Sequence, residues 1–146
     1  MFRTALALAA LTLLCAFVSA GQPPKAQKGI VIELHPPLVS GDINDVTLEK
    51  AKPESGIIVS QKEYEKLVKA WGIKRAPKVD FDKQFLLVET SVGSRIDLSL
   101  KLDNKGDLKM EWFFTADLRN GVFHYVIHAV NKKGVKTVNG KELPKE

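Results

Sequence analysis

Apolar and polar residues alternate along two successive segments in the second half of the chain. In 96–102 every even position is apolar, and in 108–114 the same phase continues, with Phe113 adding an apolar group on the polar side. A period of two is typical of β-strands with one buried face. Segment 84–92 is apolar at both phases, which is typical of a central strand, and 122–130 is a further strand. The pattern therefore predicts four consecutive long strands.

Turn-forming residues separate these strands, at Gly93-Ser94, 103–107 and Asn120-Gly121. Shorter β-branched runs at 29–34, 56–59 and 135–138 predict additional short strands. The segment 42–52 fits either a loop or a weak edge strand.

One helix is expected between the short and the long strands. Ser60 and Glu63 have the spacing of a capping box, in which their side chains accept backbone N–H groups at the helix start. Gly72 is placed to end the helix. Between these residues an apolar stripe recurs at helical spacing, namely Tyr64, Leu67, Val68 and Trp71. The stripe predicts an amphipathic helix that packs on a sheet.

The alternation also predicts the strand register. Pairing the two alternating strands about the 103–107 loop places Leu102 beside Leu108 and Ile96 beside Phe114, because a slip of one residue would exchange the faces. The next hairpin would place Trp112 near Tyr125. The expected fold is therefore α+β, an antiparallel meander of about five to seven strands with the amphipathic helix on one face. Trp71 and Trp112 should both be buried across that helix–sheet interface.

The opposite face of this meander carries the candidate binding residues. In the expected register it presents charged, histidine and exposed apolar side chains together, namely Asp97, Glu111, Phe113, His124 and Val126. Such a mixture is typical of a recognition surface. The alternative is an ordinary solvated sheet face, or one covered by the N-terminal strands.

Chemistry beyond binding finds little support in the sequence. His124 and His128 would share a strand face about 13 Å apart, too far to hold one metal ion, and His35 is the remaining histidine. No metal site or cofactor is therefore expected. A small hydrolase using Asp97, Glu111 and His124 is the rival hypothesis, although no nucleophile elbow surrounds a serine. A structural envelope protein is a third possibility.

The N-terminus resembles an export signal. Arg3 precedes an apolar run, and Val18-Ser19-Ala20 has the small residues of a cleavage site, so residues 1–20 are expected to be a signal peptide. Residues 21–28 then form a disordered leader, and 29–146 form a single α+β domain. A retained membrane anchor or a lipid on Cys15 are the alternatives. Cleavage would leave no transmembrane segment and place the protein in the periplasm or outside the cell.

Composition agrees with that compartment. Cys15 is the single cysteine, so the remaining chain must be stabilised by its core rather than by disulfides. The 22 basic and 17 acidic residues give a net charge of +5, but both signs are mixed along most of the chain. Nucleic acid is not an expected partner, because no motif for its binding is present.

Two segments resemble a known family. Ile57–Leu67 and Val79–Val88 combine a short strand, a capped helix, a Val-Asp-Phe-Asp-Lys step and a hydrophobic strand. This order is similar to the C-terminal domain of bacterial protease-complex-stabilising proteins. The resemblance implies an exported, non-catalytic accessory domain. The preferred hypothesis is an exported, non-catalytic binding or protein-interaction module whose partner is unknown, with another envelope protein as a candidate.

The first prediction concerns processing. Cleavage after Ala20 should yield a water-soluble chain that begins at Gly21, since a small-residue site follows the short apolar run. Intact-mass measurement of exported material would test this. A mass that retains residues 1–20, or that includes a lipid on Cys15, would contradict it.

Overall fold

The computed structural model describes residues 30–31, 36–115, 117 and 120–145. The expected signal peptide and the expected leader lie outside the described residues. Among the described residues, no helix has both the length and the apolar character needed to span a bilayer.

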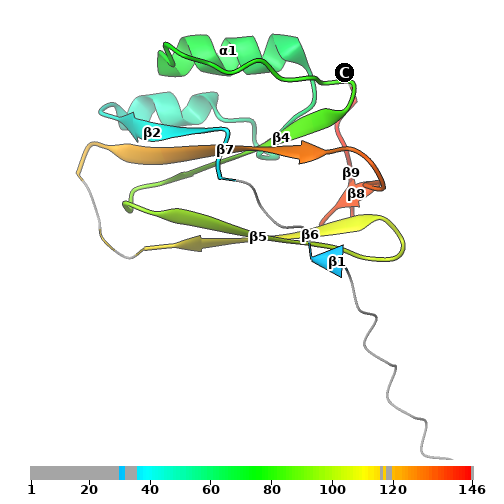
Figure 1. Ribbon diagram of the computed structural model, residues 1–146. Coiled ribbons are helices and arrows are strands. Elements are labelled where there is room, and N and C mark those ends of the chain that lie inside the picture. Colours follow the sequence, from blue (N-terminus) through cyan, green and yellow to red (C-terminus); the bar gives the residue numbers. More distant parts are fainter. Residues whose placement is uncertain (1–29, 32–35, 116, 118–119, 146) are drawn as a thin grey trace, which may run out of the picture.

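The elements form three layers, with a helical layer on a middle sheet and an outer sheet on the other side (Figure 1). The helical layer holds η1 (Val46–Ala51) and α1 (Gln61–Trp71). The middle sheet has the order β2-β7-β4-β3, with β2 (Val39–Ile43), β3 (Ile57–Ile58), β4 (Gln84–Ser91) and β7 (Phe123–Asn131). The outer sheet has the order β1-β5-β6-β8-β9, with β1 (Ile30–Val31), β5 (Ile96–Leu102), β6 (Asp107–Phe114), β8 (Thr137–Val138) and β9 (Lys141–Glu142). The expected α+β class, with antiparallel sheets and one main helix, is confirmed.

Helix α1 begins and ends where the sequence predicts. The Ser60 side chain accepts the Glu63 backbone N–H at 3.4 Å, and its hydroxyl lies 3.3 Å from a Glu63 carboxylate oxygen. Gly72 ends the helix at φ 64°, a left-handed conformation that glycine adopts without strain. Tyr64, Leu67 and Trp71 are buried, so the apolar stripe faces the middle sheet as expected.

Trp71 is the central contact of the helix–sheet core. Its ring lies 5.7 Å from the ring of Phe123 and 5.1 Å from that of Tyr125, both on β7. Its indole N–H donates to the Leu48 carbonyl at 2.9 Å, which fastens η1 to α1. One side chain therefore joins both helical segments to the middle sheet.

A second core fills the space between the two sheets. Strand β4 has four consecutive residues with no exposed surface, Phe85 to Val88. Phe85 and Leu87 pack with side chains of the outer sheet, whereas Leu86 and Val88 pack under the helix. Segment 84–92 is apolar at both phases because the helical layer covers one face of β4 and the outer sheet covers the other.

The strands are divided between two sheets rather than joined in one meander. The β5–β6 pairing is confirmed in the expected register, from Ile96 opposite Phe114 to Leu102 opposite Leu108. The expected pairing of β6 with β7 is wrong, because β7 lies between β2 and β4 in the middle sheet. The reason is burial: β7, like β4, carries apolar side chains on both faces, and a position between two layers covers both.

Gly93-Ser94 is consequently not a hairpin turn but part of the crossing from β4 in one sheet to β5 in the other. A Cβ at Gly93 would stand 2.5 Å from the Thr115 carbonyl oxygen, so this close approach requires glycine.

The expected place of Trp112 is also wrong. Its ring is half-buried and faces His128 of the middle sheet at 6.0 Å, rather than the helix. The cause is the same division of the sheets, which turns the inner face of β6 towards β7.

The two tryptophans should therefore differ in their contribution to stability. Trp71→Ala should lower the free energy of unfolding by about 3–5 kcal/mol, as for other large buried aromatic deletions. Trp112→Ala should cost less, because its ring is only partly buried. Urea denaturation of both variants measures this, and equal losses would contradict the layer assignment.

Candidate functional site

Three of the expected site residues do share a face. Asp97 on β5 lies directly opposite Phe113 on β6, and Glu111 stands two residues before Phe113 on the same side. All three are exposed, on the outer surface of the outer sheet. Phe113 is 54% exposed, an unusual value for a phenylalanine within a strand.

The other two expected site residues do not join them. Val126 is buried at 3% exposure on β7 of the middle sheet, and His124 lies on the same strand. Both expectations rested on the β6–β7 pairing, which is wrong. Asp97, Glu111 and His124, the groups of the hydrolase hypothesis, are therefore not brought together.

His124 instead belongs to a row across the middle sheet that the sequence did not indicate. Its Nδ1 lies 2.8 Å from an Asp42 carboxylate oxygen on β2, and Ser91 of β4 is its direct partner on the other side. These are the residue types of a Ser-His-Asp triad. The row was missed because the 42–52 segment does not reveal β2, whose bounds are Val39–Ile43.

The row lacks an activated nucleophile. The Ser91 hydroxyl oxygen accepts the Gly93 backbone N–H at 2.9 Å, which ties it to the crossing between the sheets. No hydrogen bond joins Ser91 to His124 in the part of the chain that the structure describes. Ser91 therefore bonds within its own turn, while His124 pairs with Asp42 across the strands.

The prominent surface feature is apolar. Four large apolar side chains of the described residues are exposed, namely Val46, Val92, Phe113 and Phe114. Figure 1 shows that β2, β4 and β6 finish, and β5 and β7 begin, at one end of the sandwich. Val46 and Val92 follow β2 and β4, and Phe113 and Phe114 end β6. We call Val92, Phe113 and Phe114 the apolar end patch, because the contact of Gly93 with Thr115 brings their segments together.

Polar contacts hold the backbone beneath this patch. The Ser94 backbone N–H lies 3.1 Å from both the Thr115 hydroxyl and an Asp117 carboxylate oxygen, and the Arg95 N–H reaches the same hydroxyl at 3.2 Å. The side chains of Ser94 and then Thr115 donate to Asp117 and hold the pKa of its carboxyl well below its usual range. These hydrogen bonds join Ser94 and Arg95, which precede β5, to Thr115 and Asp117, which follow β6.

A further polar cluster fastens the C-terminal hairpin to β6. Asp107 pairs with Lys109 and accepts hydrogen bonds from the Thr137 hydroxyl at 2.6 Å and the Gly140 N–H at 2.8 Å. These contacts, with Lys109 the largest, lower the pKa of Asp107 to about 2. Asn139 continues the contact along the edge of β6, accepting the Met110 N–H at 2.8 Å and donating to the Met110 carbonyl at 3.1 Å.

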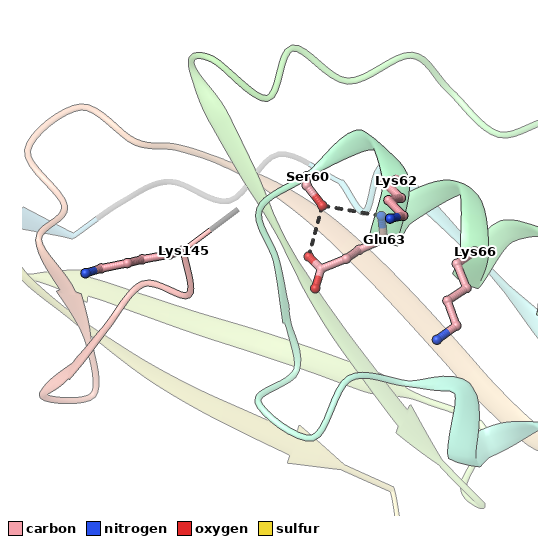
Figure 2. A pocket seen from close by; sticks show the side chains of 5 residues that line it. All are labelled: Ser60, Lys62, Glu63, Lys66 and Lys145. Atoms are coloured by element: carbon pink, nitrogen blue, oxygen red, sulfur yellow. Dashed lines mark hydrogen bonds between the residues drawn. The ribbon is translucent and has the colours of Figure 1, made fainter.

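A pocket of about 480 Å³ opens at the start of α1, lined by Ser60, Lys62, Glu63, Lys66 and Lys145. Figure 2 shows Ser60 and Glu63 bonded to each other among the three lysines. All three lysines are exposed, and the Glu63 carboxylate offsets part of their charge. Within the described ranges, no group of three or more His, Cys, Asp or Glu side chains could hold a metal ion.

His128 is the buried titratable group between the sheets. Its side chain is 7% exposed beside Trp112, and burial lowers the pKa of its imidazole below 6.5 because the charged form loses its hydration.

The free energy of unfolding should therefore fall as the pH falls below 6.5, since the unfolded chain then binds a proton that folded His128 refuses. The fall should end once the pH passes the lowered pKa of the folded state. His128→Gln should remove this component of the pH dependence below pH 6.5. Urea denaturation at several pH values measures it, and an unchanged pH dependence in the variant would contradict the assignment.

Comparison with protein-family models, with curated proteins and with solved structures finds no match for this chain. The function must therefore be inferred from the geometry of the apolar end patch and its surroundings.

Proposed function

We propose that this protein is a non-catalytic protein-interaction module that acts outside the cytoplasm and binds another envelope protein through the apolar end patch. The observation that carries the proposal is the exposure of two adjacent phenylalanines, Phe113 at 54% and Phe114 at 51%, at the end of a strand. Isolated exposed apolar residues are ordinary, but two consecutive exposed rings present apolar surface on both faces of the strand end, and aromatic side chains are enriched at contact surfaces.

The energetics of the patch favour binding. Covering apolar surface stabilises a complex by about 25 cal/mol for each Å² removed from water. Ser94 is already held by hydrogen bonds to Thr115 and Asp117, so the backbone beside the patch would lose little conformational freedom on binding. Charged groups lie beside Phe113 on the outer face of the sheet, where Asp97 is directly opposite it and pairs with Arg95 at 2.8 Å. These charges set which partner fits.

Two sequence arguments support the same proposal. The signal-like residues 1–20 favour export, and the resemblance to accessory domains of protease complexes favours a role without catalysis. The hydrolase hypothesis has less support, because Asp97 and Glu111 lie on a different sheet from His124. His124 and Val126 no longer belong to the proposed contact surface.

Replacing Phe113 should abolish the interaction while leaving the fold intact. Phe113→Ser removes an exposed ring, so the thermal melting temperature should change little, whereas proteins retained from an envelope extract by the immobilised chain should be lost. Val46→Ser is the matched control, because Val46 is also exposed, at 42%, but lies in the helical layer. Mass spectrometry of the retained proteins measures the difference.

Equal retention by both variants would contradict the proposal. A large drop in melting temperature for Phe113→Ser would show that its ring is covered within the protein.

A further inference from the structure

One edge of the outer sheet is only partly protected. On β6, residues Asp107 and Leu108 pair with β8, and Met110 is capped by the side chain of Asn139. Protection ends there, although the strand continues to Phe114. Unpaired strand edges readily accept another strand, and folded proteins normally cover or charge them.

The hydrogen-bond phase shows which backbone groups are open. Met110 turns its N–H and C=O away from β5 towards Asn139, whereas the Thr115 N–H donates to the Arg95 carbonyl on the β5 side at 3.2 Å. Because these directions alternate along a strand, Trp112 and Phe114 direct their N–H and C=O groups to the free edge. No described residue hydrogen-bonds to these four groups.

We infer that this edge binds the same edge of a second copy of the chain, in an antiparallel β6–β6 pairing with its two-fold axis at Phe113. The inference goes beyond the proposed function, because it concerns a second copy of the chain rather than another envelope protein, although both would use Phe113. With the axis at Phe113, Trp112 lies opposite Phe114 of the second copy, and each such pair exchanges two hydrogen bonds. All four open groups of each copy are then satisfied.

Other symmetric registers fit less well. An axis at Trp112 would bring Phe114 of the second copy against Met110, whose edge Asn139 already occupies. An axis at Phe114 would pair Phe114 with itself and leave Trp112 without a partner inside the strand. The axis at Phe113 is therefore the register that pairs the open backbone groups of Trp112 and Phe114 and leaves the Asn139–Met110 contact in place.

The side chains agree with this register. The two Phe113 rings meet on the outer surface, at a position where neighbouring Cα atoms stand about 4.5 Å apart. Glu111 lies opposite Thr115 of the second copy, and Arg95 of that copy is next in the same row, two strand spacings or about 10 Å from Glu111. Glu111 makes no ion pair with any described residue. Arg95 of the second copy, which pairs with Asp97 of its own chain at 2.8 Å, would place an opposite charge in the row of Glu111 on each side of the axis.

Sedimentation velocity tests the association. The purified protein should pass from monomer to dimer as its concentration rises from micromolar to millimolar. Phe113→Lys should remain monomeric, because it places like charges opposite each other at the axis. Ser99→Lys is the matched control, adding the same charge on the same face of β5 away from the edge, and it should still dimerise. A wild-type chain that stays monomeric throughout would overturn the inference.

A cysteine pair tests the register. In a Cys15→Ser background, Phe113→Cys should oxidise rapidly to a covalent dimer, since the expected Cα separation lies within the range of disulfides. Phe114→Cys, which is almost equally exposed, should cross-link much more slowly because its neighbour is Trp112 of the second copy. Equal rates would overturn the proposed register.

The two proposals can fail separately. If the wild-type chain is monomeric but still retains another protein in a Phe113-dependent manner, the β6 pairing is wrong and the interaction module stands. If it neither dimerises nor retains any protein, both proposals are wrong.

Discussion

The structure depends on the burial of the middle sheet from both sides. Phe85 to Val88 have no exposed surface, and successive side chains alternate between the helix and the outer sheet. Each of the other layers covers one face of this sheet and has no comparable cover of its own. Since a strand with two apolar faces is stable only between two layers, the position of β4 and β7 determines where every other element lies.

Polar contacts connect the layers where apolar packing ends. On the helical side, Lys52 pairs with Glu89 of β4, and Glu49 accepts the Thr90 hydroxyl at 2.6 Å. In the outer sheet, Asp107 accepts hydrogen bonds from Thr137 and Gly140, which hold the C-terminal hairpin against β6. These contacts occur at the margins of the sheets, where backbone groups would otherwise be exposed. They also decide which stretch of edge stays open, because the cover from the hairpin reaches Met110 and no further.

The candidate site follows from this distribution. Phe113 and Phe114 stand on the part of β6 that neither the hairpin nor the middle sheet covers, so their exposure reflects the limits of both contacts. The same place combines apolar rings with open backbone groups. Association with another strand would pair the backbone groups and cover the rings at once, whereas a small polar ligand would leave the rings exposed.

Local features of the sequence determined the helix and the β5–β6 hairpin. The capping residues Ser60 and Gly72 act within a few residues of themselves, and a short loop allows only one register for two strands with the same alternation. The exposure of Phe113 and its position opposite Asp97 followed from that register. These parts could be predicted because the interactions that form them connect neighbours in the chain.

The tertiary structure alone decided which sheet each strand joins. The alternation of apolar and polar residues along a strand shows which residues share a face of the sheet. It does not show which layer packs on that face. His124 and Val126 were therefore placed on the wrong surface, and the row from Asp42 to Ser91 was missed because it joins three strands far apart in the sequence. The apolar character of segment 84–92 at both phases did indicate cover on both faces, and a single helix can supply only one of them. The second cover is the outer sheet, and its position depends on packing between distant segments that no local pattern records.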